Sequence, residues 1–247
     1  MPVHKSTVLI LRCIDHSETS QVVYLLAREV GRVRCLAKGS KRGLNPFSGP
    51  LDRWILGEAV FSLTDPNRLG TLMELYETDR FEGVREKLPG FYGASLATEL
   101  VLALVPEADL QPAVFDLTVE VLQVLAECEP DACQAVTFAF AWRLLGLLGY
   151  APPMDRCIEC DAVLAAGSPL EFNAGLGGPV CAQCRAKGPT IRMTGKAAEA
   201  VGFLAGAEWN EVRRVRLSEP TARQMRAVLS ARVAELSGKE LATARYV

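Results

Sequence analysis

The stretch that decides the fold reads TVLILRCIDHSETSQVVYLLAREVGRVRCLAK and runs from Thr7 to Lys38. It contains three runs rich in apolar and β-branched residues, which is the composition of β-strands. The step from Val30 to Gly31 is typical of a hairpin turn between the second and third runs. We therefore predict three consecutive strands, over 7–14, 20–30 and 31–38.

Two further strands are expected downstream, over 54–63 and 69–76. The residues between them, Thr64-Asp65-Pro66-Asn67, are a strong turn signal. Residues 40–50 are rich in Gly, Ser, Asn and Pro and are predicted to form a loop. Five short strands in about 75 residues match a small closed barrel such as an OB-fold. The periodicity alone does not separate this from an SH3-like barrel or a small sandwich.

From Phe81 the pattern becomes helical. Prolines and glycines delimit helices over 93–105, 112–128, 131–149 and 218–237, with another helical stretch beginning at Thr194. Asp131 is expected to cap the third of these helices. That helix is apolar nearly all round, so we place it at the centre of a bundle. It contains Gln134 and Arg143, which favour a buried helix over a membrane span.

The 247 residues suffice for one large domain or two to three small ones. The predicted fold class is α+β with several domains: a barrel over 1–80, an all-α domain over 81–153 plus 189–247, and a segment over 154–188 inserted between its parts. A composition of 49% apolar and 23% charged residues excludes disorder, collagen-like repeats and coiled coil as the main architecture. No secretory signal opens the chain, and we expect a cytoplasmic protein.

The net charge of −2 hides a segregation of charges. Residues 1–53 hold nine Lys and Arg against four Asp and Glu, whereas 81–153 hold three against ten. Residues 189–247 are again basic. A nearly neutral total therefore does not exclude an anionic partner.

Four of the eight cysteines form two Cys-x-x-Cys pairs twenty residues apart: Cys157, Cys160, Cys181 and Cys184. Two such knuckles can complete a tetrahedral shell of thiolates around zinc. A shell of four protein ligands leaves no position for water or substrate, so the predicted zinc, one per chain, is structural. A redox pair is the alternative, and it normally needs only one Cys-x-x-Cys. The other four cysteines lie among apolar neighbours and are expected to be core residues.

The second signal is a basic stretch that follows the hairpin turn. If residues 32–38 form a strand, the even-numbered positions share one face, and the loop beyond adds two cations. Such a surface would track a phosphate backbone, although a solvated strand face explains the pattern equally well. The candidate DNA-binding residues are Arg32, Arg34, Lys38, Lys41 and Arg42. Tyr24, Phe47 and Trp54 are candidates for base stacking, although core packing is the commoner role of such residues.

Enzyme signals are weak. No phosphate-binding loop, no dinucleotide-binding glycine motif and no nucleophile elbow is present, and the only histidines are His4 and His16. We predict no catalytic residues. In the last helix, Arg232 falls on the apolar stripe of Met225 and Leu229, and the acidic segment 81–153 is a source of partners for it.

Together these residues resemble the RecO family of bacterial DNA repair proteins. The resemblance rests on the strand 7–14, Glu18-Thr19-Ser20 before the second strand, the motif from Leu36 to Arg42, the strands of 51–75, the apolar helices and the late four-cysteine knuckle. It implies an N-terminal OB-fold that binds single- and double-stranded DNA and anneals complementary strands without ATP. It also implies RecR and the single-stranded-DNA-binding protein as partners, and help in loading the RecA recombinase.

Two further hypotheses follow. Arg223, Arg226 and Arg232, on the only cationic helix outside the barrel, are expected to receive the acidic tail of the single-stranded-DNA-binding protein. The alternative function is a zinc-ribbon adaptor that binds only protein. A metal-dependent hydrolase would need an open metal site, against which four thiolates argue.

Overall fold

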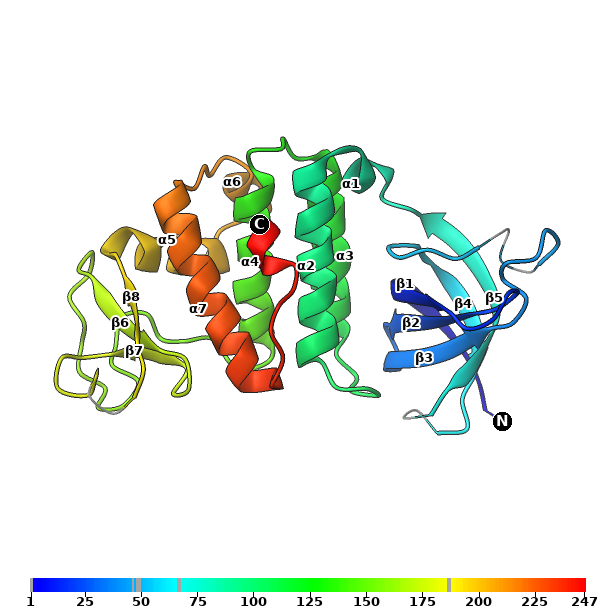
Figure 1. The fold of residues 1–247 in the computed structure, drawn as a ribbon, viewed down its shortest axis with the longest axis horizontal. Helices are drawn as coiled ribbons and strands as arrows, with labels where there is room; N and C mark the ends of the chain where they lie inside the picture. Colours follow the sequence, from blue (N-terminus) through cyan, green and yellow to red (C-terminus); the bar gives the residue numbers. More distant parts are fainter. Residues whose placement is uncertain (1, 46, 48–49, 66–67, 186–187) are drawn as a thin grey trace. The chain divides into compact units, whose positions relative to one another are not determined.

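The computed structural model describes residues 2–45, 47, 50–65, 68–185 and 188–247. The chain divides into two compact units, each described by itself. The barrel unit comprises Met1–Glu82 and Val105–Gln123, and the helical unit comprises Gly83–Leu104 and Val124–Val247. Figure 1 shows the elements of both along the chain. Pro66 and Asn67, from the predicted turn, lie outside the described residues.

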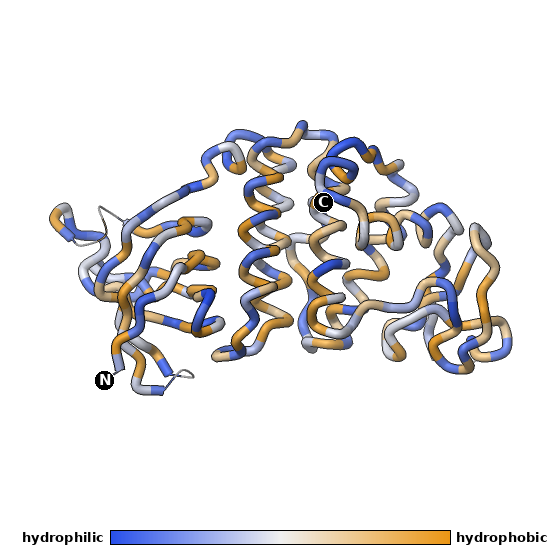
Figure 2. The backbone as a smooth tube through the Cα atoms, turned by 180° about the vertical axis from the view of Figure 1, so that it is seen from behind, coloured by the Kyte–Doolittle hydropathy of each residue, from blue (hydrophilic) through white to orange (hydrophobic). Residues whose placement is uncertain are grey.

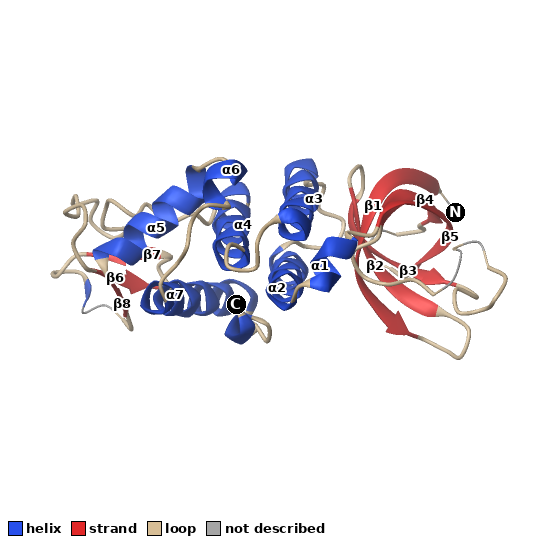
Figure 3. Ribbon diagram, turned by 90° about the horizontal axis from the view of Figure 1, so that it is seen from above, coloured by secondary structure: helices blue, strands red, loops and turns tan. Residues whose placement is uncertain are grey.

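Five strands close into a barrel in the order β1-β2-β3-β5-β4 (Figure 3). The pairing of β3 with β5 is parallel and covers only Cys35–Ala37, whereas the other neighbours are antiparallel. The prediction of five strands in this region is thereby confirmed. The bounds are β1 Val3–Asp15, β2 Gln21–Ala27, β3 Gly31–Ala37, β4 Leu56–Ser62 and β5 Gly70–Asp79.

The alternation of side chains along these strands fills the barrel interior. In β3, Val33, Cys35 and Ala37 point inward and are fully buried, while the residues between them are half-buried. Phe47 and Trp54 are also buried, so two of the three candidates for base stacking are core residues. Trp54 has a left-handed backbone with φ of 61°, and its N–H donates to the Ile10 carbonyl at 2.7 Å.

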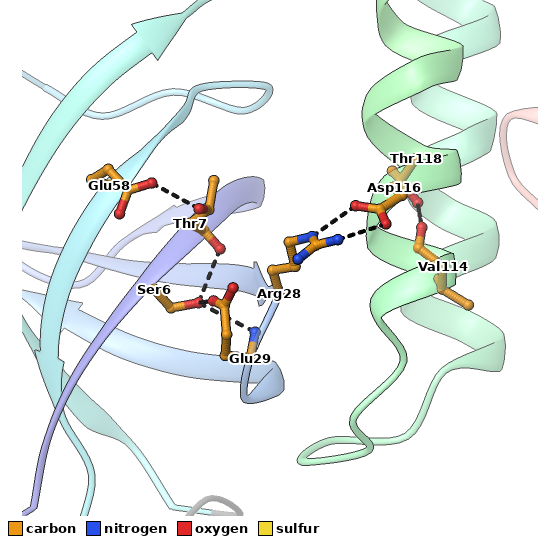
Figure 4. A network of polar contacts seen from close by, with 8 residues as sticks. All are labelled: Ser6, Thr7, Arg28, Glu29, Glu58, Val114, Asp116 and Thr118. Carbon is orange, nitrogen blue, oxygen red and sulfur yellow. Dashed lines mark hydrogen bonds and ion pairs between the residues drawn. The ribbon is translucent and has the colours of Figure 1, made fainter.

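Residues 105–123 pack with the barrel, which differs from the predicted boundary at residue 80. The first part of α3 (Pro112–Glu127) belongs to this segment. Arg28, just after β2, donates to both carboxylate oxygens of Asp116 at 2.8 and 3.0 Å (Figure 4). Gly31 has φ of 89°, and a Cβ there would lie 2.3 Å from the Asp109 carbonyl oxygen, so the close approach requires glycine.

The helical unit is centred on α4 (Cys133–Leu147), whose residues are buried through every turn and are mostly apolar (Figure 2). It packs against α2, α5 and α7. Asp131 does not cap it: Ala132 occupies the N-cap position without a side-chain bond, and Asp131 pairs with Arg216. The other elements of this unit are α1 Glu82–Glu86, α2 Leu88–Leu104, α5 Gly195–Gly206, α6 Trp209–Val212, α7 Glu219–Ser237 and the short 3-10 helix η2 Ala244–Tyr246.

Residues 170–193 form a small antiparallel sheet in the order β7-β6-β8 that the sequence did not predict. Its strands are β6 Leu170–Asn173, β7 Gly178–Val180 and β8 Ile191–Met193. Three or four residues are too few to show a period of two. Among the described residues, no helix combines the length and the apolar character that crossing a membrane requires.

Candidate functional site

The four cysteines of the two knuckles converge on one point. Their Sγ atoms all lie within 4.8 Å of one another, and those of Cys160 and Cys181 are 3.7 Å apart. Sulfurs bound to one tetrahedral zinc at about 2.3 Å would be separated by about 3.8 Å. The cluster therefore has the donor set and the spacing to hold a metal ion of this type.

Backbone turns aim the sulfurs inward. The Asp161 N–H donates to the Cys157 carbonyl at 2.9 Å, and the Cys184 N–H donates to the Cys181 carbonyl at 3.1 Å. Each pair thus bends within one turn, which turns its two side chains to the same side. The Cys181 N–H also donates to the Cys157 Sγ at 3.3 Å and links the two knuckles.

Backbone N–H groups around the sulfur favour a thiolate at Cys157. Burial of this thiol raises its pKa, but the backbone N–H groups of Cys181, Cys160 and Glu159 outweigh that effect and lower the pKa to about 6. Metal binding requires thiolates. Hydrogen bonds from the backbone also lower the pKa of Cys181, whereas the pKa of Cys160 is raised and that of Cys184 is raised to about 12, so only two of the four thiols favour the thiolate form before an ion binds.

The predicted basic strand is partly engaged within the protein. Arg34 Nε lies 2.9 Å from the Glu107 carboxylate, and Arg32 Nη1 lies 4.0 Å from it. Arg32 Nε also donates to the Val105 carbonyl at 2.9 Å, and desolvation lowers the pKa of this guanidinium. The Arg32 side chain is only 13% exposed and that of Arg34 is 36% exposed. Glu107 could not be identified from the sequence, because it lies 73 positions from Arg34 in the chain.

The loop after β3 leaves two of its three cations exposed to solvent. Lys38 and Arg42 are exposed, and Lys41 pairs with Asp15 at 2.6 Å. Buried Ser40 donates to the Gln21 side chain at 3.0 Å and anchors the loop to the barrel. The loop therefore holds its cations on a fixed backbone at the end of β3.

Two further residues, Arg12 and Tyr24, lie on the same surface, and their proximity was not predicted from the sequence. Tyr24 is half-buried on the outer face of β2, directly opposite Arg12 in β1 and Arg34 in β3. The Arg12 guanidinium carbon lies 5.9 Å from the centre of the Tyr24 ring. Alternation along β1 could have flagged Arg12, since it is the only cation in the run 7–14.

The three arginines predicted on α7 have different environments. Arg223 is 73% exposed and lies 3.8 Å from Glu219. Arg226 donates from Nε to the Val247 carbonyl at 2.6 Å. Arg232 donates to the Ala174 carbonyl at 3.0 Å, so its hydrogen-bond acceptor belongs to the inserted segment rather than to the acidic segment 81–153.

The remaining cysteines behave as the apolar pattern indicated. Cys35, Cys128 and Cys133 are buried, and Cys13 is half-buried. Burial raises the pKa of Cys35 to about 12, as expected for a core thiol.

Comparison with known proteins covers nearly the whole chain. The N-terminal model of recombination protein O matches residues 1–78, and its C-terminal model matches residues 85–244. The chain is 28% identical to the DNA repair protein RecO of Symbiobacterium thermophilum, over 100% of this chain and 97% of that protein. It is 32% identical to RecO of Pelotomaculum thermopropionicum over 74% and 69% of the two chains. RecO of Bacillus subtilis is 27% identical over 97% of this chain and 91% of its own length.

Proposed function

The chain belongs to the RecO family of DNA repair and recombination proteins, and from this premise we propose that it binds DNA and anneals complementary strands without nucleotide hydrolysis. The proposed DNA-binding surface is the outer face of β1–β3 with the loop that follows β3. The observation that carries the proposal is the row of cations there. Its members are Arg12, Arg34, Lys38, Lys41 and Arg42, and the largely buried Arg32 precedes Arg34 on the same face of β3.

The barrel order supports this choice of face. We propose that the barrel is of the OB-fold type, in which the face of the second and third strands commonly receives oligonucleotides. Tyr24 and Arg34 lie on those two strands. Because phosphate contacts position a protein without reading bases, binding through these cations is independent of sequence.

Annealing needs no chemistry on either strand. Two single strands repel each other through their phosphates, and a cationic surface that neutralises one strand lowers that repulsion. Such a reaction needs no hydrolysis and no catalytic side chain. The proposed mechanism therefore rests on the spacing of cations rather than on a reactive group.

We propose that Cys157, Cys160, Cys181 and Cys184 bind one structural zinc. The convergence of the four sulfurs within 4.8 Å of one another supports this, and four thiolates leave no position for a substrate. When bound, the ion cross-links a segment whose strands are too short to form a core of their own. The zinc would therefore maintain the fold of 154–193 without taking part in DNA binding.

Partners follow from the family. We propose RecR, the single-stranded-DNA-binding protein and, through them, loading of the RecA recombinase, which places the protein in the cytoplasm at the nucleoid. Of the arginines suggested to receive an acidic tail, Arg223 offers the most exposed guanidinium. Arg226 and Arg232 would first have to exchange their bonds to Val247 and Ala174.

A gel-shift titration at two salt concentrations tests the DNA-binding proposal. The parent chain and an Arg42→Glu/Lys38→Glu variant are compared on the same labelled oligonucleotide. We expect weaker binding at higher salt, and weaker binding of the variant than of the parent at each salt concentration. Failure of the parent to shift DNA at low salt would leave the protein-only adaptor as the better function.

A further inference from the structure

We propose that Tyr24 is a stacking platform for one base of single-stranded DNA. The inference rests on the proposed function and adds to it a contact that distinguishes single strands from duplex. Aromatic side chains beside cations are the usual means by which proteins bind single strands without sequence preference.

The register of the strands builds the platform. Tyr24 on β2 is directly opposite Arg12 on β1 and Arg34 on β3, so the three residues form one row across the outer face of the barrel. Side chains directly opposite on one face lie in contact range. Tyr24 thereby lies between two arginine residues: the Arg12 guanidinium lies over the ring, and the Arg34 guanidinium pairs with Glu107.

A second row lies two residues further along, on the same face. It contains Ile14, Val22 and Leu36, of which Ile14 is 37% exposed. This apolar row separates the aromatic ring from the cationic loop at Lys38 and Arg42. The face therefore presents three features in order: a row with an aromatic ring between two arginines, a row of apolar side chains, and the cationic loop. This order suits a base flanked by phosphates.

The ring is partly held in place. The Arg12 guanidinium carbon lies 5.9 Å from its centre, within the range of a cation–π contact. Such a contact limits the rotamers of Tyr24 and lowers the entropy lost when a base binds. The half-buried state of Tyr24 leaves part of the ring accessible to a base.

Stacking is compatible with annealing for a geometric reason. A base that stacks on Tyr24 uses its π-face, which leaves its hydrogen-bonding edge available to a complementary strand. In duplex DNA the faces of internal bases are already covered by their neighbours. The platform should therefore contribute to binding of single strands and contribute little to binding of duplex.

The experiment compares Tyr24→Leu and Tyr24→Phe with the parent chain by fluorescence anisotropy. The probes are an oligothymidylate of about 12 nucleotides, an abasic oligonucleotide of the same length and a duplex. Leucine retains apolar bulk for folding, whereas phenylalanine retains the ring. Tyr76→Leu is the matched control, because this tyrosine is 66% exposed on the outer face of β5 and faces Glu58 rather than cations.

We expect Tyr24→Leu to weaken binding of oligothymidylate about 5- to 160-fold, the range for loss of one stacked base. The slope of log affinity against log salt should stay unchanged, because no charge is removed. Tyr24→Phe and Tyr76→Leu should bind like the parent, and the abasic probe should bind parent and Tyr24→Leu equally.

Two results would overturn the platform. One is an oligothymidylate affinity of Tyr24→Leu equal to that of the parent, and the other is an equal loss on the abasic probe. A parent chain that binds neither single-stranded probe at low salt would instead refute the proposed function itself. The two failures are therefore distinguishable in one set of titrations.

Discussion

On the proposed DNA-binding surface, the carboxylate of Glu107 is expected to compete with DNA phosphates. Its carboxylate lies 2.9 Å from Arg34 Nε and 4.0 Å from Arg32 Nη1. The N–H of the next residue, Ala108, donates to the Arg32 carbonyl at 2.9 Å, so the backbone beside the carboxylate is fixed to the edge of β3. Glu107 should therefore compete with DNA for Arg34.

The substitution Glu107→Gln removes the charge and keeps the shape. With Arg34 neutralised, four cations remain for a single strand, namely Arg12, Lys38, Lys41 and Arg42. Lys41 is counted because the carboxylate of its partner Asp15 is 65% exposed, so solvent screens that ion pair. Log affinity should then fall against log salt with a slope of about −2.8. Releasing Arg34 adds one contact and should steepen the slope to about −3.5. Raising the salt concentration from 50 to 200 mM should then weaken DNA binding about 50-fold for the parent and about 130-fold for Glu107→Gln.

The assay is anisotropy of a labelled oligothymidylate at four or more salt concentrations. Glu74→Gln on β5 serves as control, because it changes the net charge by the same amount at an exposed site away from the β1–β3 face. The loss of a partly exposed ion pair should lower the free energy of unfolding by no more than about 1 kcal/mol. An unchanged slope in Glu107→Gln, or an equal change in Glu74→Gln, would refute the competition.

Three further outcomes are expected. Cys157→Ser should lose its bound zinc, measured by metal analysis of the purified chain, and hydrogen exchange should show lost protection within 154–193 while the barrel stays protected. The Arg28 guanidinium holds the pKa of Asp116 below its usual value, so this ion pair stabilises the fold above about pH 4 and stops doing so as the pH falls through the lowered pKa. The free energies of unfolding of the parent and of Asp116→Asn, measured by denaturant titration, should therefore differ at pH 6 and converge in acid. Gly177→Ala should lower the free energy of unfolding by about 1 kcal/mol or more, measured by denaturant titration, because φ is +83° and the new Cβ would lie 2.6 Å from a guanidinium nitrogen of Arg232.

The strands of the barrel and the metal cluster could be predicted because their signals are local. Alternation over seven or more residues marks a strand, and the spacing within a Cys-x-x-Cys pair reflects one turn. The strand β6 and its neighbours escaped prediction because they are three or four residues long and depend on pairing with each other. The predicted domain boundaries stay a prediction. Packing groups residues 105–123 with the barrel unit, whereas the sequence placed them in the helical domain.

The electrostatic state of the basic strand could not be predicted, for a topological reason. The pairing of β3 with β5 covers only the end of β3, which leaves the edge at Gly31–Arg34 open. The segment that contains Glu107 pairs with this edge instead, through a bridge between Arg32 and Glu107. Glu107 lies 73 positions from Arg34, with which it forms the ion pair. No sequence period connects two such segments, so the ion pair becomes visible only in three dimensions.

Arg32 and Lys38 are both predicted from the sequence to bind DNA, but their environments in the structure predict different roles. Arg32 is largely buried, donates to the Val105 carbonyl and has its pKa lowered by desolvation, whereas Lys38 is exposed. Arg32→Ala should therefore lower the free energy of unfolding by about 1 to 3 kcal/mol, the range for a lost hydrogen bond from a charged group, and leave the salt slope unchanged. Lys38→Ala should leave stability unchanged and make the slope shallower by about 0.7. Denaturant titrations and salt-dependent anisotropy on the same two preparations decide the matter. Equal effects of both substitutions on the slope would mean that Arg32 leaves Val105 and Glu107 to contact DNA, and the assignment of Arg32 to the fold would then be wrong.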